Sequence, residues 1–451
     1  SDLRVIYSYA DRYLFQANIR HDGSSRFAKG YRWGTFPSFS AGWVMSEEKF
    51  MKSLNWDWLS FLKLRGSWGI LGNERIGDDY FPYIALMSFG NSLFYMADGS
   101  VVSDKTARPA ILAVEDITWE TTTSTDFGLD ANFFNNRLQF HFDYYWKQTK
   151  DMLLKIEIPY FMGYNNPNTN AGKMSTHGYD IELAWNDRIG DLQYGVNVNF
   201  SDFLSKIDYM NDGEQISNGK IKRAGVLFNE YYGYVCDGIY QTQEEVNNSA
   251  RTSTTVTVGD LKYRDISGPD GVPDGIISPE YDRVPLGNSL PRFQYGGTFN
   301  ASYKGIDFSI AFQGIGKQNS YLSTAMVQPL RDNYGSVPSI IEGKYWSPFN
   351  TAEENLSARY PRLSNVSKSN NYATSSFWMF NGSYFRLKNL TLGYTLPETW
   401  TQKAGIDRVR FYISGSDLFC LSNFPDGWDP EMGASSYPIT TSLVMGLQVN
   451  F

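Results

Sequence analysis

The chain has 451 residues, of which 42% are hydrophobic, 16% aromatic and 20% charged, a profile that excludes a disordered chain and a coiled coil. Its 40 basic and 48 acidic residues give a formal net charge of −8, so no overall basic field is present to bind nucleic acid. The three histidines and two cysteines are far apart in the sequence, which excludes zinc or iron sites of the usual His/Cys type.

The dominant pattern is an alternation of apolar and polar residues, which predicts β-strands. Within 137–147, Phe140, Phe142 and Tyr144 share one face, and Gln139 and His141 share the other. The same reading predicts about a dozen strands along the chain, at 12–20, 33–45, 58–71, 118–133, 137–150, 173–187, 192–206, 292–303, 306–318, 384–396, 408–420 and 437–451.

The length of these strands favours a membrane barrel over a soluble β-fold. A soluble sandwich also alternates, but its strands are about 5 to 6 residues long, whereas several segments here continue for about the 9 to 11 residues that cross a bilayer. Aromatic residues lie near the ends of the apolar faces, as in Tyr144 and Trp146, where an interfacial girdle would place them. No apolar run approaches the roughly 18 residues of a membrane-spanning helix. We therefore predict an all-β, antiparallel transmembrane β-barrel.

The connections support the same interpretation, because barrels of the outer membrane alternate short periplasmic turns with long extracellular loops. If the chain ends on the periplasmic side, the tight links 135–136, 186–191 and 304–305 all lie there. The long segments 73–117, 207–291 and 319–383 are then extracellular. The terminal Phe451, which closes an alternating strand, is expected to act as an assembly signal, although a final Phe also occurs by chance.

Several stretches resemble, in order, the barrel of SusC/RagA-type TonB-dependent transporters. They are 20–27, 33–43, 62–69 with 72–73, 118–122, 170–174, 384–394 and 427–431. The resemblance implies a Gram-negative outer-membrane importer with a 22-stranded barrel, a plug and energy supplied by TonB. It also implies a SusD-like surface lipoprotein as a lid, and it allows a dimer of such transporter–lipoprotein pairs.

The plug and the TonB-box region have no counterpart in these 451 residues. About a dozen strands cannot close a 22-stranded wall, and an open edge in lipid would leave backbone groups unpaired. We therefore expect the chain to be the C-terminal part of a longer protein, with further strands pairing at both of its edges.

Segment 259–275 carries the densest group of acidic and turn residues. In the resembled family this loop often reads like an EF-hand, and Asp265, Ser267, Asp270 and Asp274 are the ligands that calcium would take here. An extra residue near Pro269 shifts the later positions by one. The alternative is a turn whose carboxylates cap local backbone groups.

Aromatic side chains of the outer loops are the expected substrate contacts, because sugar rings and peptides pack on aromatic faces. Each can equally belong to the core of its loop or to the docking surface for the lid. The candidates are Tyr160, Tyr164, Tyr231, Tyr232, Tyr345, Trp346 and Trp378.

Nothing in the sequence predicts catalysis. Asp429 and Glu431 could suggest a glycosidase pair, but no other catalytic pattern accompanies them, and we interpret them as loop architecture. Cys236 and Cys420 could form a disulfide in the oxidising exterior or remain unpaired.

Three functions follow from these observations. The first is active import of a large nutrient, with a glycan favoured over an oligopeptide on the strength of the resemblance alone. The second is a passive porin or an adhesin barrel. The third is a secreted carbohydrate-processing enzyme on a soluble β-fold.

Overall fold

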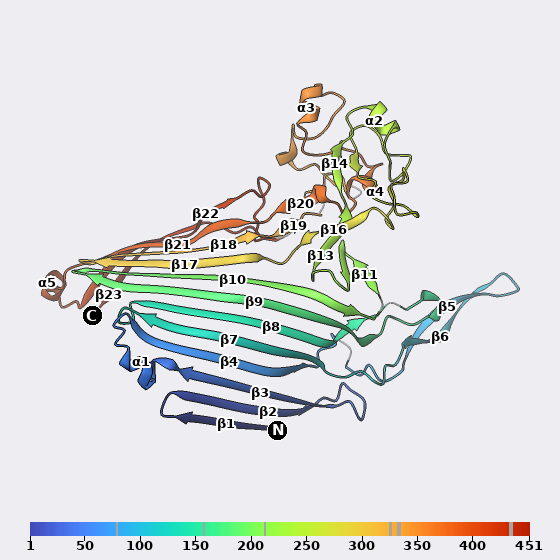
Figure 1. The fold of residues 1–451 in the computed structure, drawn as a ribbon. Helices are drawn as coiled ribbons and strands as arrows, with labels where there is room; N and C mark the ends of the chain where they lie inside the picture. Colours follow the sequence, from blue (N-terminus) through green and yellow to red (C-terminus); the bar gives the residue numbers. More distant parts are fainter. Residues whose placement is uncertain (78–79, 157, 212, 324–326, 332–334, 433–435) are drawn as a thin grey trace. The chain divides into compact units, whose positions relative to one another are not determined.

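The computed structural model describes residues 1–77, 80–156, 158–211, 213–323, 327–331, 335–432 and 436–451. The chain forms two compact units. The first comprises Ser1–Ile181, Phe203–Gln215 and Lys222–Leu227, and the second Glu182–Asp202, Ile216–Ile221 and Phe228–Phe451. Both are built mainly from strands (Figure 1), which confirms the all-β prediction. No described helix is both long and apolar enough to cross a membrane.

In the first unit, long strands lie side by side in the order β1, β2, β3, β4, β7, β8, β9. Strand β10 pairs with β9, and both contribute residues to each unit. The bounds are β1 (Asp2–Tyr9), β2 (Tyr13–Gly23), β3 (Trp33–Val44), β4 (Leu59–Asn73), β7 (Glu120–Phe133), β8 (Leu138–Lys155), β9 (Asn168–Ile189) and β10 (Leu192–Met210). The short elements are η1 (Met45–Glu47), α1 (Lys49–Ser53) and η2 (Tyr160–Met162), with a separate hairpin of β5 (Leu86–Tyr95) and β6 (Val101–Ile111).

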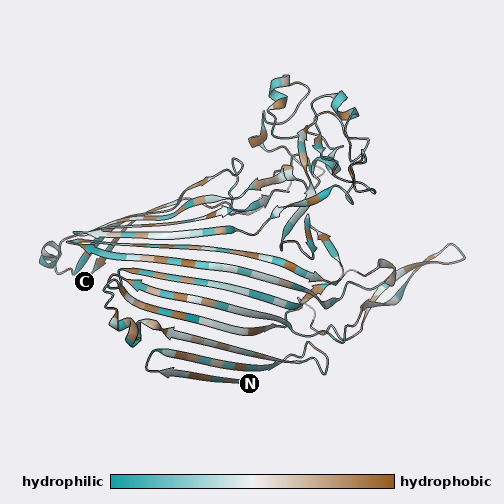
Figure 2. Cartoon of the chain, viewed as in Figure 1, coloured by the Kyte–Doolittle hydropathy of each residue, from teal (hydrophilic) through white to brown (hydrophobic). Residues whose placement is uncertain are grey.

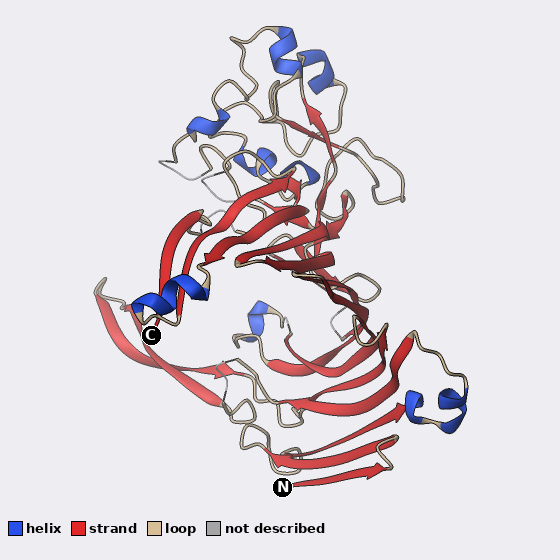
Figure 3. Ribbon diagram, turned by 90° about the vertical axis from the view of Figure 1, so that its left-hand side faces the viewer, coloured by secondary structure: helices blue, strands red, loops and turns tan. Residues whose placement is uncertain are grey.

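In the second unit, the long strands follow in the order β10, β17, β18, β21, β22, β23. The bounds are β17 (Arg292–Tyr303), β18 (Ile306–Lys317), β21 (Tyr384–Thr395), β22 (Arg408–Ser422) and β23 (Ser442–Asn450). The connections carry β11 (Glu214–Ser217), β12 (Lys220–Arg223), β13 (Glu230–Tyr234), β14 (Cys236–Ile239), β15 (Leu261–Tyr263), β16 (Arg283–Asn288), β19 (Asn319–Tyr321) and β20 (Met379–Asn381). The helices, which are short and lie outside the long strands (Figure 3), are α2 (Gln243–Asn247), η3 (Ser339–Ile341), α3 (Ala352–Leu356), α4 (Lys368–Asn371), η4 (Ser376–Trp378), α5 (Glu398–Thr401) and η5 (Gln402–Ala404).

The long strands have one polar and one apolar face, because residues of like character are in register across neighbouring strands. On the polar face of the first unit, Gln16 lies opposite Ser40, and Ser40 lies opposite Ser67. On the other face, Phe39 and Trp68 stack with ring centroids 5.9 Å apart and remain exposed. Figure 2 shows the resulting alternation of hydropathy along the strands.

Tight turns join β17 to β18 and β7 to β8, where the sequence predicts them. Lys304 and Gly305 form a two-residue turn between the paired residues Tyr303 and Ile306, with φ values of 44° and 87°. Residues 134–136, between β7 and β8, also have positive φ values. Backbone of this left-handed kind matches the right-handed twist of paired strands.

The structure differs from the predicted strands in several places, and all three segments expected as long loops contain strands. Strand β1 precedes the predicted segment 12–20, and its consecutive Val5, Ile6 and Tyr7 break the period of two. The segment 73–117, expected as a loop, contains the β5–β6 hairpin. The last strand begins at Ser442 instead of 437, because Pro438 lacks the N–H group that a strand ladder uses.

An ion-pair network crosses the polar face of the first unit. The guanidinium of Arg65 on β4 donates to Asp130 on β7 at 2.8 and 3.0 Å, and to Asp143 on β8 at 3.0 Å. Gly128 on β7 is in register with both Arg65 and Asp143. A Cβ atom at Gly128 would lie 2.4 Å from Arg65 Cζ and 2.6 Å from Asp143 Oδ1. The missing side chain therefore leaves the space through which Arg65 reaches across β7.

We expect Gly128→Ala to displace the Arg65 guanidinium and to destabilise the full-length protein by no more than about 1 kcal/mol, because the atoms that must shift end flexible, partly exposed side chains. The measurement is the temperature at which the protein loses its heat-modifiable migration on a gel. Gly90→Ala on β5 is the matched control, since a Cβ atom there meets nothing within 4 Å. Equal shifts in the two variants would contradict the role given to Gly128.

Candidate functional site

The long connections of the second unit fold together into one body, here called the loop pack and defined as the described residues of 228–291 and 319–383. One of its apolar cores contains Tyr234, Leu261 and Tyr263 from the first connection, with Ala373 and Phe377 from the second packed against them. Figure 1 shows β14, α2, α3 and α4 gathered in this body. Residues far apart in the sequence therefore share one interior.

A buried carboxylate lies at the centre of the loop pack. Asp260 is 0% exposed, and its oxygens accept hydrogen bonds from Arg362 Nε at 2.7 Å and from Ser367 Oγ at 2.8 Å. Asn371 Nδ2 and the backbone N–H of Thr257 donate at 3.0 and 2.9 Å. A charge removed from water is costly unless it is paired and hydrogen-bonded, and both conditions are met here.

Two asparagine side chains extend this network along β15. Asn371 Oδ1 accepts from the backbone N–H of Leu261 at 2.9 Å, and Asn370 Nδ2 donates to the Leu261 carbonyl at 2.9 Å. The Trp378 indole N–H donates to the Asn371 carbonyl at 2.8 Å. Side-chain amides therefore bond the backbone of one connection as a neighbouring strand would.

Three of the aromatic candidates lie inside the loop pack. Trp378 is fully buried, and Tyr232 and Trp346 are buried. The Trp346 indole N–H donates to Gln241 Oε1 at 3.2 Å. In this arrangement these side chains form the interior of the loops, which was one of the two interpretations that the sequence left open.

The other candidates are more accessible. Tyr231 is half-buried, and its ring is tilted against that of Tyr321 with ring centroids 5.5 Å apart. Tyr345 is also half-buried. In the first unit Tyr164 is half-buried, while Tyr160 begins η2 and its side chain lies outside the described part of the chain. Substrate contact by these residues stays a prediction.

In the segment expected to bind calcium, carboxylates accept hydrogen bonds from nearby backbone N–H groups. Asp265 and Asp274 each accept from a backbone N–H, at 2.6 and 3.0 Å. The buried Asp282 accepts from three backbone N–H groups, one of them that of Ser267, at 2.7, 2.7 and 3.2 Å. Asp270 is exposed, and no group of three His, Cys, Asp or Glu residues in the described chain is arranged to hold a metal. Calcium binding by these side chains stays a prediction.

Burial disfavours ionisation of two tyrosines and one cysteine of the loop pack. Burial raises the pKa of Tyr263 well above its ordinary value and that of Tyr372 to about 12. It also raises the pKa of the Cys236 thiol to about 11, which disfavours the reactive thiolate. Cys236 and Cys420 are both free thiols in the structure.

The central residues of the loop pack were not among the sequence candidates. Asp260 lies in the acidic segment singled out from the sequence, but its partner Arg362 is 102 positions away. A weak signal was present in the short polar side chains of 364–371, which lie within an aromatic-rich connection. Polar residues that interrupt such a segment are candidates for a buried network.

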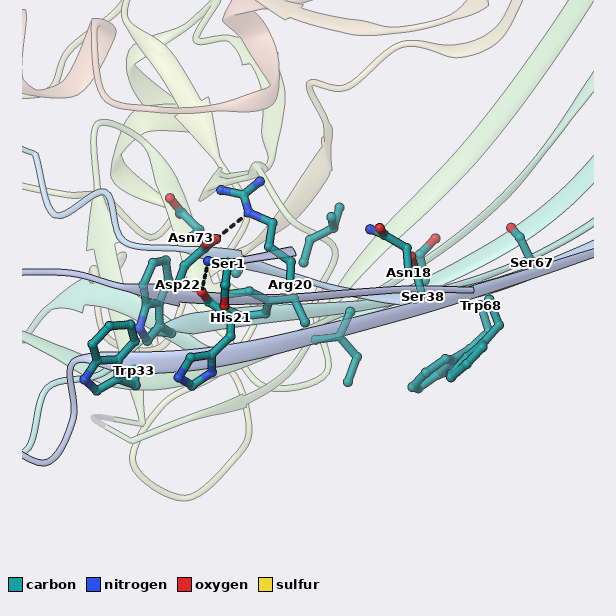
Figure 4. A pocket seen from close by; sticks show the side chains of 18 of the residues that line it. Ser1, Asn18, Arg20, His21, Asp22, Trp33, Ser38, Ser67, Trp68 and Asn73 are labelled. Carbon is teal, nitrogen blue, oxygen red and sulfur yellow. Dashed lines mark hydrogen bonds and ion pairs between the residues drawn. The ribbon is translucent and has the colours of Figure 1, made fainter. Parts of the chain in front are cut away.

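A separate cleft of about 890 Å³ in the first unit is lined by residues of β2, β3 and β4, and Figure 4 shows it from close by. Asn18 and Arg20 lie on the polar face of the sheet, while the stacked rings of His21 and Trp33 lie on the other face. Its lining therefore comes from both faces of the sheet.

We expect Arg362→Ala to open the loop pack, because it leaves the Asp260 carboxylate buried without its cation. Breaking a buried pair in this way costs about 3–5 kcal/mol. The measurement is limited proteolysis of the full-length protein, with cleavage expected in 228–291 and 319–383.

Arg264→Ala is the control. Arg264 pairs with Asp237 in the same loop pack at 2.5 Å, but its side chain is 58% exposed, so its loss should cost no more than about 1 kcal/mol. Equal protection of the Arg362 variant and the wild type would contradict the central role of Asp260.

Comparison with known proteins identifies the family. A family model described as "TonB dependent receptor-like, beta-barrel" matches residues 3–414. "TonB-dependent receptor P3" of Formosa agariphila is 30% identical over 484 residues, covering 99% of this chain and 45% of that protein. "TonB-dependent receptor SusC" of Bacteroides thetaiotaomicron is 30% identical over 466 residues, covering 99% and 43%. The chain therefore spans less than half the length of these relatives.

The fold agrees with a solved structure. That of "the RagAB peptide transporter" matches with a TM-score of 0.79 and 23% identity, covering 99% of this chain and 46% of that chain. The match extends along both units, which shows that the strands follow the same course. The chain belongs to the TonB-dependent receptor-like β-barrel family.

Proposed function

We propose that this chain forms part of the wall and outer mouth of a TonB-dependent importer. The proposal rests on one observation: the long strands have one polar face and one exposed apolar face. Large apolar side chains such as Leu3, Phe127 and Leu443 are exposed on these strands, while charged and amide side chains line the opposite face. A soluble protein rarely leaves so much apolar surface open to water, whereas a barrel in lipid requires it.

We place the protein in the outer membrane of a Gram-negative bacterium, as a multi-pass β-barrel. The tight turn at Lys304 and Gly305 would face the periplasm, and the loop pack would face outward. Phe451 follows β23 and its ring is exposed, which suits a signal read by an assembly factor. The short turns and long connections support this orientation.

The partners we propose are a SusD-like surface lipoprotein, acting as a lid, and TonB, acting through a region outside this chain. In the loop pack, Phe349, Leu356 and Val366 are strongly exposed, Phe349 at 96%. Exposed apolar side chains of this kind commonly mark interaction sites. A dimer of transporter–lipoprotein pairs is compatible with the same surfaces.

A glycan is the first cargo class that we propose, and an oligopeptide is the second. The polar face carries many hydroxyl and amide groups, such as Ser40, Asn197 and Thr391, which can exchange hydrogen bonds with sugar hydroxyls. Half-buried rings in the loops offer faces on which sugars stack. These groups also suit a peptide backbone, so cargo must be tested directly.

We expect uptake by cells that express the full-length protein to fall to background when TonB is deleted, because active import requires energy from TonB. The measurement is accumulation of fluorescently labelled oligosaccharides and oligopeptides of matched size. Uptake that persists without TonB would support a passive porin and contradict the proposal. Preferential uptake of the peptides would overturn the choice of a glycan.

We expect Tyr231→Ala and Tyr345→Ala each to weaken binding of the transported cargo about threefold to tenfold, since one aromatic contact contributes about 0.5–1.5 kcal/mol. The measurement is a binding titration with the purified full-length protein. Tyr95→Ala, which removes an exposed ring from the β5–β6 hairpin, is the matched control. Unchanged affinity in both loop variants would remove these residues from the binding site.

A further inference from the structure

A single buried arginine joins the last long connection to the strands of the second unit. Arg386 lies on β21 with a side chain that is 4% exposed. Its Nη2 atom donates to both carboxylate oxygens of Asp429, at 2.6 and 2.5 Å. Its Nε atom lies 3.0 Å from Glu431 Oε2. Two carboxylates of the connection 423–441 therefore converge on one guanidinium of the sheet.

The neighbouring strand supports this contact. Gln313 on β18 is in register with Arg386, and its amide donates to Glu431 and to the Tyr384 hydroxyl, the latter at 3.2 Å. The backbone N–H of Glu431 donates to Asp429 Oδ1 at 2.9 Å, which holds the two acids in a fixed relation. The carboxylates thus meet a surface formed by two adjacent strands.

Aromatic residues of the same connection pack against the loop pack. Phe424 is buried in a core with Leu322, Val327 and the fully buried Trp378. Trp428, next to Asp429, packs against this core. The segment 424–431 therefore contacts the loop pack through its rings and the strands through its acids.

We propose that residues 424–431 form a strap that fastens the loop pack to the strands, with Arg386 as its anchor. The strap gives the loop pack a fixed attachment besides the chain connections that lead into it. Removal of Arg386 would leave two partly buried carboxylates close together without a cation, which is strongly unfavourable. The strap would then lift from β18 and β21 while the strands themselves stay paired.

Two of the stretches that resemble the family meet at the strap. Arg386 lies in the stretch 384–394, and both acids lie in the stretch 427–431. The structure brings these stretches into direct contact. The inference rests on this geometry and does not depend on the cargo or on active transport.

The test is hydrogen–deuterium exchange, followed by mass spectrometry, on the full-length protein in detergent. In Arg386→Met, backbone amides of 424–432 should exchange at least tenfold faster than in the wild type, and those of 377–380 should also exchange faster. Arg386→Lys, which keeps a charge but loses the separate nitrogens that reach Asp429 and Glu431, should give an intermediate acceleration.

Arg410→Met is the matched control. Arg410 on β22 makes a similar bidentate pair with Asp307 on β18, at 2.9 and 2.5 Å, but neither residue touches the strap in this network. Exchange in 424–432 should remain at the wild-type rate in this variant. Wild-type exchange in Arg386→Met, or equal acceleration in Arg410→Met, would overturn the proposal.

A second variant covers the case in which Arg386→Met does not assemble. Asp429→Asn combined with Glu431→Gln keeps the arginine and the size of each side chain but removes both negative charges. Faster exchange confined to the strap and the loop pack is expected, with heat-modifiable migration retained. Unchanged exchange in this assembled variant would contradict the proposal.

Discussion

The structure depends first on backbone pairing between long strands that have one polar and one apolar face. The backbone N–H and C=O groups of such a strand form hydrogen bonds with neighbouring strands. Its side chains point alternately to the two faces, so one face can be polar and the other apolar. A shift of one residue in register would exchange the two faces completely. The ladder that places Gln16 opposite Ser40, and Ser40 opposite Ser67, is therefore what keeps the polar groups together.

Charged side chains of the long connections are buried together with opposite charges and hydrogen-bonding groups. Asp260 in the loop pack is surrounded by Arg362, a hydroxyl, an amide and a backbone N–H, while Arg386 receives two carboxylates. In each case one buried charged group contacts side chains from segments that are distant in the sequence. A fully paired polar network is specific in a way that apolar contacts are not, because each member requires defined partners. The outer connections thereby acquire one arrangement despite their polar composition.

The long strands could be predicted from the sequence because their signal is local. Alternation over ten or more residues identified β17 at the bounds that the structure shows, 292–303, and the Lys304-Gly305 turn has its own local chemistry. The loop pack could not be predicted in this way, since Asp260 meets Arg362 only through the tertiary fold. Gly128 is similar, because its importance comes from Arg65 and Asp143 on neighbouring strands. The aromatic candidates were chosen by residue type, which does not distinguish a buried ring from an accessible one.

The separation of the two halves of the loop pack also sets the order in which it can fold. Asp260 and Arg362 are 102 positions apart. Closing so long a loop lowers the conformational entropy of the chain before any contact can offset that loss. The hairpin of β17 and β18 lies between them and forms through its own two-residue turn, which shortens the distance that the remaining chain must close. We therefore expect the loop pack to form after this hairpin. Until the second connection folds back on the first, the Asp260 carboxylate lacks the cation that pairs with it.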